Sequence, residues 1–235
     1  MGQYVKPKVT LVAWTTNPLE AMVSQVDNMF GNMTHDLSTI TPERCTEVLD
    51  EIKKTGLKGA LEIIDLTFQI EDVPRSFTHQ LVRNRIGATY HQESLRFTER
   101  EGGFNYDIGR SIRNNPEARE RYEALMKHIA EEYDALREYD GVQTEDVRGV
   151  LPISVCTKIG FKVNFKTLMH MSHVRLCIQS QNHWYEVMRL MKKEVAEKVS
   201  PELAELLQPI CDAEGKCAFK SKFDRTCPKA IKLKL

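Results

Sequence analysis

The chain has 235 residues, of which 41% are hydrophobic, enough to build one large domain or two small ones around a buried core. Lysine plus arginine and aspartate plus glutamate each number 33, so the net charge is zero and no basic field favours nucleic acid. The sequence has no run of about 18 apolar residues and no secretory signal. We therefore expect a soluble, intracellular, cytoplasmic protein with neither a membrane nor a nucleic-acid partner.

The amino-terminal part predicts a strand followed by two helices. Residues 9–13 alternate apolar and polar side chains, which indicates a short strand, and residues 19–30 are predicted to be helical. A second helix is expected to begin at Thr41, a hydroxyl cap that is followed by a proline and an acidic residue. It should run to about residue 54 and end at Gly56 in a left-handed conformation.

The next elements surround a cluster of polar residues. Residues 61–70 alternate in the period of a strand, which Pro74 should end. Ser76 can cap the following helix, and Gly87 is expected to break it. Residues 88–97 are then predicted to form an ordered loop.

The carboxy-terminal half is mainly helical. Apolar residues at helical spacing predict a long amphipathic helix over residues 117–139, and Thr144 should cap a short helix that carries Arg148. A strand is expected around residues 161–163, followed by a helix over residues 165–175. A last long helix carries apolar residues from Trp184 onward.

This order of elements predicts a mixed α/β (α+β) fold, with a central sheet flanked by several long helices. A single catalytic domain is expected over residues 1–200, followed by a tail over residues 201–235 that is rich in cysteine and lysine. In that tail, five residues separate Cys211 from Cys217 and nine separate Cys217 from Cys227. A zinc site usually spaces its ligands by about two to four residues, so no metal site is expected.

Residues 78–97, THQLVRNRIGATYHQESLRF, are the most informative segment. They contain Arg83, Arg85 and Arg96, and Arg100 follows shortly after. The guanidinium group grips phosphate or carboxylate with two parallel hydrogen bonds, so the cluster favours an anion site. On a continuing helix Arg83 and Arg85 would point in different directions, one toward a nucleotide and the other toward a second ligand or a partner subunit.

This segment resembles the Arg-His-Arg…Ser signature of the flavin-dependent thymidylate synthases. Arg83-Asn84-Arg85 stands where the family has Arg-His-Arg, and Gln80 stands where the family has a nucleotide-binding glutamine. Ser94-Leu95-Arg96-Phe97 resembles the family's Ser-x-Arg-Tyr. The first half of the family pattern is therefore present in order.

A second block is similar to the same family. DVRGVLP places Arg148 just ahead of Leu-Pro, as in the family. VNFKTLMHMSHVR resembles the family's Val-Asn-x-Arg-x-Leu run and supplies four candidate residues, namely Asn164, Lys166, His170 and Arg175. Two blocks in order and at suitable separation are more specific than either block alone.

The resemblance implies an enzyme that converts dUMP to dTMP and works as a homotetramer. FAD would supply the hydride, methylenetetrahydrofolate the one-carbon unit and NADPH the reducing power. Arg175 would be the catalytic residue that activates the uracil ring. The dUMP-binding residues that the resemblance implies are Gln80, Arg83, Gln92, Glu93, Ser94, Leu95, Arg96, Arg148 and Arg175. The implied FAD-binding residues are Arg83, Asn84, Arg85, Gln92, Asn164, Lys166 and His170.

The chain also departs from the family pattern. Asn84 replaces the motif histidine, Lys166 replaces an arginine, and eight residues rather than seven separate Arg85 from Ser94. Residues 57–60 read Leu-Lys-Gly-Ala where the family has His-Glu-Thr/Ser-Pro. These departures leave two alternatives open: a related flavoenzyme that modifies a pyrimidine nucleotide, for example by hydroxymethylation, or a catalytically silent homologue that binds nucleotides or nucleic acid.

Single residues keep simpler interpretations as well. Arg83 and Arg85 could form structural ion pairs with acidic neighbours, and His170 could be a half-buried structural histidine. Trp184 is typical of a core residue. No cysteine lies inside either block, which fits a reaction without a cysteine nucleophile; the nearest is Cys177.

Overall fold

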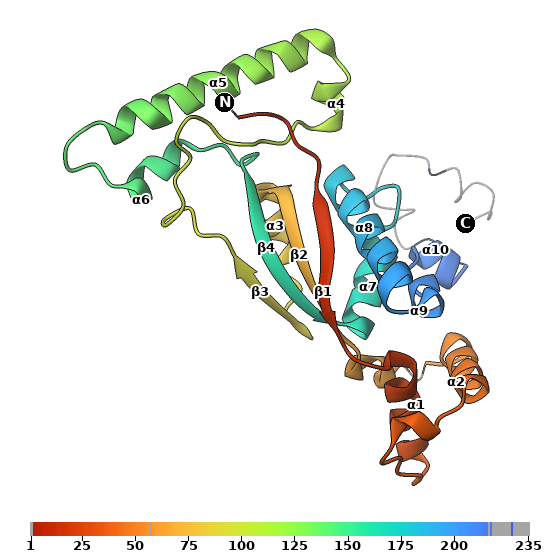
Figure 1. Ribbon diagram of the computed structural model, residues 1–235. Coiled ribbons are helices and arrows are strands. Elements are labelled where there is room, and N and C mark those ends of the chain that lie inside the picture. Colours follow the sequence, from red (N-terminus) through yellow and green to blue (C-terminus); the bar gives the residue numbers. More distant parts are fainter. Residues whose placement is uncertain (1, 57, 216, 218–226, 228–235) are drawn as a thin grey trace. The chain divides into compact units, whose positions relative to one another are not determined.

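The computed structural model describes residues 2–56, 58–215, 217 and 227 and confirms a mixed α/β architecture (Figure 1). Four strands form one sheet in the order β1-β2-β4-β3. Their bounds are Lys8–Trp14 for β1, Asp65–Pro74 for β2, Ala88–Gln92 for β3 and Cys156–Asn164 for β4. The hydrogen bond from Thr15 N to Asp65 O, at 3.0 Å, joins the end of β1 to the start of β2, so this pair is antiparallel.

The chain divides into two compact units, and each contributes part of the sheet. The first unit contains Met1–Val9, Gln69–Asn84 and Tyr90–Gly160, and the second contains Thr10–Phe68, Arg85–Thr89 and Phe161–Leu235. The first of the two family-like blocks, from Gln80 to Phe97, is thus divided between the two units.

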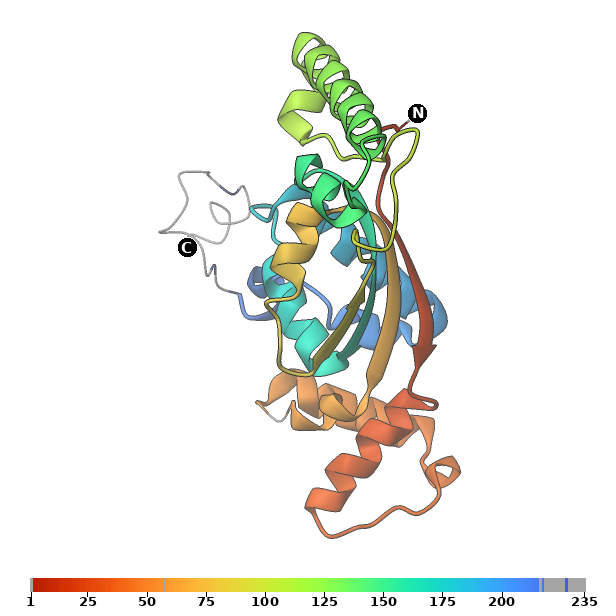
Figure 2. The ribbon, with the colours of Figure 1, turned by 90° about the vertical axis from the view of Figure 1, so that its left-hand side faces the viewer.

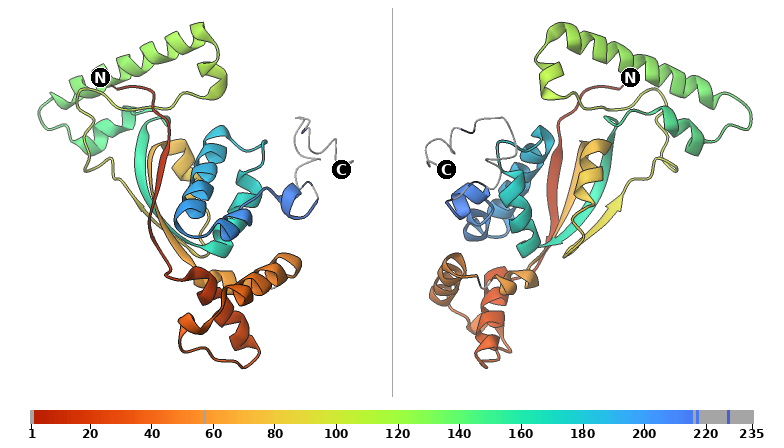
Figure 3. Two further views of the ribbon diagram at one scale, coloured as in Figure 1. Left: turned by 45° about the vertical axis from the view of Figure 1, so that its right-hand side comes forward. Right: turned by 180° about the vertical axis from the view of Figure 1, so that it is seen from behind.

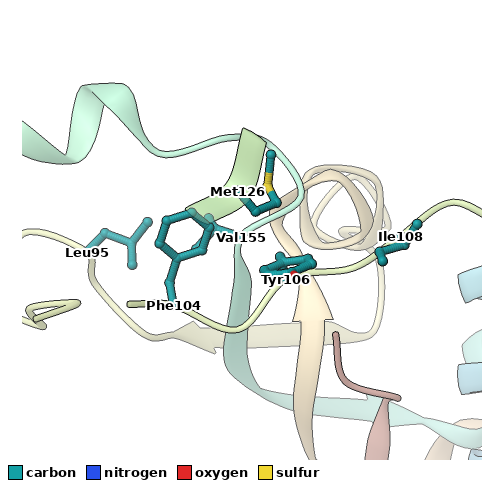
Figure 4. Close-up of a cluster of buried hydrophobic side chains, with 6 residues drawn as sticks. All are labelled: Leu95, Phe104, Tyr106, Ile108, Met126 and Val155. Atoms are coloured by element: carbon teal, nitrogen blue, oxygen red, sulfur yellow. The ribbon is translucent and has the colours of Figure 1, made fainter. Parts of the chain in front are cut away.

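The first unit packs a long helix against loops and short helices. Its helices are α3 (Arg75–Leu81), α4 (Arg110–Arg113), α5 (Pro116–Arg137), α6 (Thr144–Val147) and η3 (Arg148–Val150). Helix α5 begins with a side-chain cap, because Asn115 Oδ1 accepts from Ala118 N at 3.1 Å, and α4 and α6 contact it (Figure 2). This unit contains a cluster of buried hydrophobic side chains, namely Leu95, Phe104, Tyr106, Ile108, Met126 and Val155 (Figure 4).

The second unit is mostly helical (Figure 3). Its helices are α1 (Pro18–Met29), η1 (Leu37–Thr39), α2 (Pro42–Lys54), η2 (Gly59–Ile63), α7 (Phe165–Arg175), α8 (Asn182–Lys198), α9 (Pro201–Glu205) and α10 (Ile210–Ala213). Glu194 of α8 accepts from Leu11 N at 2.6 Å, and Lys198 donates to Leu11 O at 3.2 Å. These bonds tie α8 to β1. Among the described residues, no helix has both the length and the apolar character that a membrane crossing requires.

Several predicted boundaries are confirmed and several are wrong. Helix α7 spans the predicted residues, and Thr41 caps α2 by accepting from Arg44 N at 3.3 Å. Gly56 does not adopt a left-handed conformation, because Thr55 N already closes the last turn of α2 by donating to Glu51 O at 2.9 Å. Ser76 lies inside α3, whose cap is Pro74.

Two further predictions need correction. Thr144 is the first residue of α6 and not its cap. Residues 88–92 form strand β3 and not a loop. The tail predicted from residue 201 begins with α9 and α10, in which Leu203 is fully buried. Residue 57 and residues 216, 218–226 and 228–235 of that tail lie outside the described residues, and the domain boundary at residue 200 stays a prediction.

Candidate active site

In the first unit, hydrogen bonds fix the turn that carries Arg83 and Asn84. Asn84 Nδ2 donates to Leu81 O at 3.0 Å, and the Tyr90 hydroxyl lies 2.9 Å from Leu81 O and 2.5 Å from Asn84 O. These bonds satisfy carbonyl groups at the end of α3, so the predicted continuation of the helix through Arg83 is wrong. Burial raises the pKa of Tyr90 to about 12, so its hydroxyl remains a donor at neutral pH.

Gln92 and Glu93 are adjacent, yet their side chains have different partners. Gln92 Nε2 donates to Thr78 Oγ1 of α3 at 2.9 Å. The Glu93 carboxylate accepts from Arg100 at 2.8 Å and from Thr157 at 3.2 Å, and only 15% of its side chain is exposed. Gln92 is therefore tied to the helix that carries Gln80, whereas the Glu93 carboxylate is held in a structural ion pair.

The Ser94–Arg96 turn follows directly. Ser94 Oγ accepts from Arg96 N at 3.3 Å, and the Leu95 side chain is buried in the core cluster, so only its backbone is available to a ligand (Figure 4). Arg96 forms an ion pair with the Glu145 carboxylate, and Arg148 Nε donates to the Glu145 carbonyl at 3.0 Å. One acidic residue of α6 thus contacts two of the predicted arginines.

Two arginines in this region were not predicted to be site residues. Arg100 was noted only as part of the cluster, and Arg75 was missed because it lies ahead of the family motif. Arg75 Nη1 donates to Glu93 O at 3.3 Å, and its backbone N donates to Val155 O at 3.0 Å. Burial lowers the pKa of Arg75; the Glu93 carboxylate opposes this shift, and the neighbouring Arg148 and Arg100 add to it. A proline at a strand end followed by arginine is the only sequence signal that could have pointed to it.

In the second unit, helix α7 presents the predicted flavin-binding side chains. Asn164 caps the helix, since its Oδ1 accepts from Thr167 N at 2.8 Å. Lys166 pairs with Glu62 of η2 at 2.5 Å. His170 follows Lys166 by four residues, so both lie on one face of α7. Burial lowers the pKa of His170, and the nearby cations Lys166 and Lys58 lower it as well, which keeps the imidazole neutral at pH 7.

The turn that contains Arg85 is bonded to the same end of α7. Gly87 O accepts from Asn164 N at 2.8 Å, and Ile86 O accepts from Thr167 Oγ1 at 3.0 Å. Arg85 itself is exposed. The second unit therefore holds the turn that carries Arg85 against the amino-terminal end of α7, where Asn164 and Lys166 lie, and His170 follows one turn further along the helix.

Arg175 lies at the end of α7 against an aromatic ring. Its guanidinium carbon is 4.2 Å from the ring centroid of Trp184, which is fully buried on α8. Stacking of this kind holds a guanidinium in a fixed orientation and contributes about 0.5–2 kcal/mol. Burial lowers the pKa of Arg175, although a guanidinium still keeps its charge at neutral pH. Trp184 is thus both a core residue, as predicted, and a stacking platform.

The thiols near the site are not activated. Burial raises the pKa of Cys177 and of Cys156, so both are protonated at neutral pH and are poor nucleophiles. Among the residues that the structure describes, no group of three or more histidine, cysteine, aspartate or glutamate side chains could hold a metal ion.

Comparison with known proteins gives a consistent result. Residues 10–202 match the family of the thymidylate synthase complementing protein. A flavin-dependent thymidylate synthase of Geobacter sulfurreducens is 32% identical over 236 residues, covering 97% of this chain and 96% of the relative. One from Thermococcus onnurineus is 35% identical over 86% of this chain and 82% of its own length. The crystal structure of PolB, a UMP/dUMP methylase from Streptomyces cacaoi bound with 5-Br dUMP, superposes with a TM-score of 0.74 at 18% identity, covering 88% of this chain and 96% of PolB.

Proposed function

Since the chain belongs to the family of flavin-dependent thymidylate synthases, we propose that it methylates carbon 5 of dUMP to give dTMP. The proposed one-carbon donor is methylenetetrahydrofolate, and NADPH is the proposed reductant of the flavin. The observation that carries this proposal is the pair of Arg175 and Trp184 at the end of α7. A guanidinium that is stacked and partly buried can stabilise the negative charge that develops on a planar ring.

Arg175 is proposed to activate the uracil ring. A hydrogen bond from a guanidinium to a uracil carbonyl polarises the N3–H group and stabilises the negative charge that develops when carbon 5 attacks an electrophile. The ring of Trp184 keeps the guanidinium oriented before the substrate arrives. No thiol is needed in this scheme, which agrees with the raised pKa of Cys177.

The first unit is proposed to bind the nucleotide. Ser94, Arg96 and Arg148 would hold the dUMP phosphate, and Gln80, Gln92 and Arg83 would contact the nucleoside. A charge-assisted hydrogen bond contributes about 1.5–3 kcal/mol, so two or three of them give useful affinity. Glu93 would act through its ion pair with Arg100, which fixes the strand end next to Ser94. Leu95 would contribute its backbone only.

The residues around α7 fit a flavin nucleotide with a diphosphate. Lys58 and Lys166 supply positive charge, and because Oδ1 of Asn164 is occupied by the helix cap, its Nδ2 is the group that remains to donate to a ligand. The other residues proposed to contact FAD are Arg83, Asn84, Arg85, Gln92 and His170. When bound, FAD supplies the hydride that completes the methyl group. In a proposed homotetramer, residues of different copies could share one site.

Anaerobic turnover tests the proposal. The purified protein is reconstituted with FAD and supplied with NADPH, methylenetetrahydrofolate and dUMP, and the product is measured by mass spectrometry. A product heavier by one CH₂ supports the proposal, and unchanged dUMP with a bound, reducible flavin overturns it. UMP is run alongside, since the solved PolB structure is described as a UMP/dUMP methylase. Methylation of UMP alone would assign a related pyrimidine-nucleotide methylation instead.

A further inference from the structure

The pairing of β3 with β4 fixes where the turn that carries Arg85 ends. Gly87 O accepts from Asn164 N at 2.8 Å, and Glu93 N donates to Lys158 O at 3.0 Å. Gly87 and Glu93 are as far apart in sequence as Lys158 and Asn164, so the ladder between these bonds contains no bulge. The regular ladder therefore begins at Gly87, directly after the turn that carries Arg85 and Ile86.

Gly87 is the one position in this turn where a side chain does not fit. Its φ of +65° lies in the left-handed region that favours glycine. A Cβ atom there would lie 2.2 Å from Asn164 Nδ2 and 2.7 Å from Thr167 Oγ1. Both contacts are far shorter than van der Waals distance, so any other residue would have to displace the Asn164 amide.

The amide of Asn164 cannot move without cost. Its Oδ1 accepts from Thr167 N and caps α7, while the Thr167 hydroxyl donates to Ile86 O. Gly87, Asn164 and Thr167 thus form one interlocked contact between the turn that carries Arg85 and the start of α7. Displacing one member disturbs the helix cap and the turn together.

We propose that Gly87 is a positioning residue, which holds the Asn164 amide and the Arg85 turn in the arrangement that the flavin diphosphate requires. This inference rests on the proposed function, because it takes a flavin nucleotide as the ligand of this set. The backbone of the turn can pass directly against Asn164 only because residue 87 has no Cβ atom.

Gly87→Ala tests this proposal against a matched control. Gly31 also has a positive φ, +83°, but its Cβ would meet nothing within 4 Å. Gly31→Ala therefore reproduces the backbone strain without the collision. FAD affinity is measured by quenching of flavin fluorescence, and the Asn164 side-chain amide is followed by NMR in the ligand-free protein. We expect Gly87→Ala to weaken FAD binding by about tenfold or more, the cost of losing one charge-assisted hydrogen bond. The NMR signal of the Asn164 side-chain amide should shift in the same variant. Gly31→Ala should change neither quantity appreciably.

Thr167→Val gives a second variant in case Gly87→Ala does not fold. It removes the hydroxyl that donates to Ile86 O but leaves the backbone of the turn unstrained. A loss of FAD affinity in the same direction, by about threefold, supports the proposal. Equal FAD affinity in Gly87→Ala and Gly31→Ala, or an unshifted Asn164 amide, overturns it. If the wild-type protein binds no FAD, the proposed function fails, whereas the NMR measurement still decides whether Gly87 positions Asn164.

Discussion

The two units hold their site arginines in different ways. In the first unit two guanidinium groups face carboxylates: Arg96 pairs with Glu145, and Arg100 pairs with Glu93 at 2.8 Å. In the second unit Arg175 lies on the ring of Trp184, 4.2 Å from its centroid. A carboxylate neutralises the charge of its arginine, whereas an aromatic ring orients the guanidinium and leaves the charge available.

This difference matches the groups that the arginines of each unit are proposed to bind, the nucleotide phosphate in the first unit and the uracil ring in the second. A phosphate carries full charge in solution and can replace a weakly held carboxylate, because an exposed ion pair contributes only about 0–1 kcal/mol. The charge on uracil develops only in the transition state, so the group that stabilises it must already be in place. An arginine that exchanges a carboxylate for the phosphate should tolerate substitution better than an arginine that must already be oriented when the transition state forms.

The largest effect is therefore expected at Arg175. Arg175→Lys keeps the positive charge but loses the planar fork and the stacking on Trp184. We expect kcat/KM for dUMP to fall about 10²- to 10³-fold, the usual cost of one oxyanion-stabilising donor. Steady-state kinetics measure this effect. Arg189→Lys is the matched control, because Arg189 lies 6.0 Å from the ring centroid of Tyr185 on α8. Activity of Arg175→Lys within threefold of that control would refute the role.

Arg75 is expected to show the next largest effect. It is held by Glu93 O and lies near Arg148 and Arg100, so it adds positive charge where the phosphate is proposed to bind. We expect Arg75→Met to raise KM for dUMP about tenfold or more, the cost of one charge-assisted hydrogen bond, with a smaller effect on kcat.

The control for Arg75 is Arg119→Met, which removes an arginine paired with Glu123 on the surface of α5. Its KM should stay at the wild-type value. A fall in kcat without a change in KM for Arg75→Met would show that Arg75 does not bind the nucleotide.

Tyr90 should produce a change in stability that depends on pH. Its pKa of about 12 in the folded protein exceeds the usual value of about 10. The neutral phenol is therefore favoured by folding, and this contribution is complete below about pH 10 and lost as the pH rises toward 12. Tyr90→Phe should cost about 1 kcal/mol at pH 8 and should remove this loss at high pH. Urea unfolding at pH 8, 10 and 11 measures both effects.

Tyr139→Phe is the control for Tyr90, because Tyr139 is 67% exposed. Its unfolding free energy should follow that of the wild type across the whole pH range. If Tyr90→Phe also followed the wild type between pH 10 and 11, the Tyr90 hydroxyl would not be buried in the way that raises its pKa.

Local sequence signals predicted part of this structure well. Helix α7 was predicted at its observed bounds because its cap, Asn164, and its apolar residues are neighbours in sequence. Strand β3 was missed because ATYHQ has little apolar alternation, and its extended form depends on pairing with β4. Gly87 was predicted to break a helix, yet α3 ends earlier, where Tyr90 and Asn84 bond to its last carbonyls. Those partners meet only in the folded chain.

In the candidate site, too, local sequence signals were predictable and contacts between distant residues were not. The sequence predicted which segments carry the positively charged site residues, because the arginine cluster and the two family-like blocks are visible in it. Side-chain direction was not predictable: Gln92 and Glu93 are neighbours, yet one bonds to Thr78 of α3 and the other to Arg100. Arg75 was missed for a related reason, since only the folded chain brings it beside Glu93.

The smallest predicted effect tests the exchange of carboxylate for phosphate directly. Glu145→Gln leaves the backbone carbonyl that accepts from Arg148 but removes the charge that pairs with Arg96. Because 57% of the Arg96 side chain is exposed, the pair contributes little, and we expect KM for dUMP to fall only about two- to threefold with kcat unchanged. The gain should shrink as salt is raised from 50 to 500 mM. Glu123→Gln, which removes a comparable acid from α5, should leave KM unchanged. A higher KM in Glu145→Gln would mean that Glu145 orients Arg96 for the nucleotide rather than competing with it.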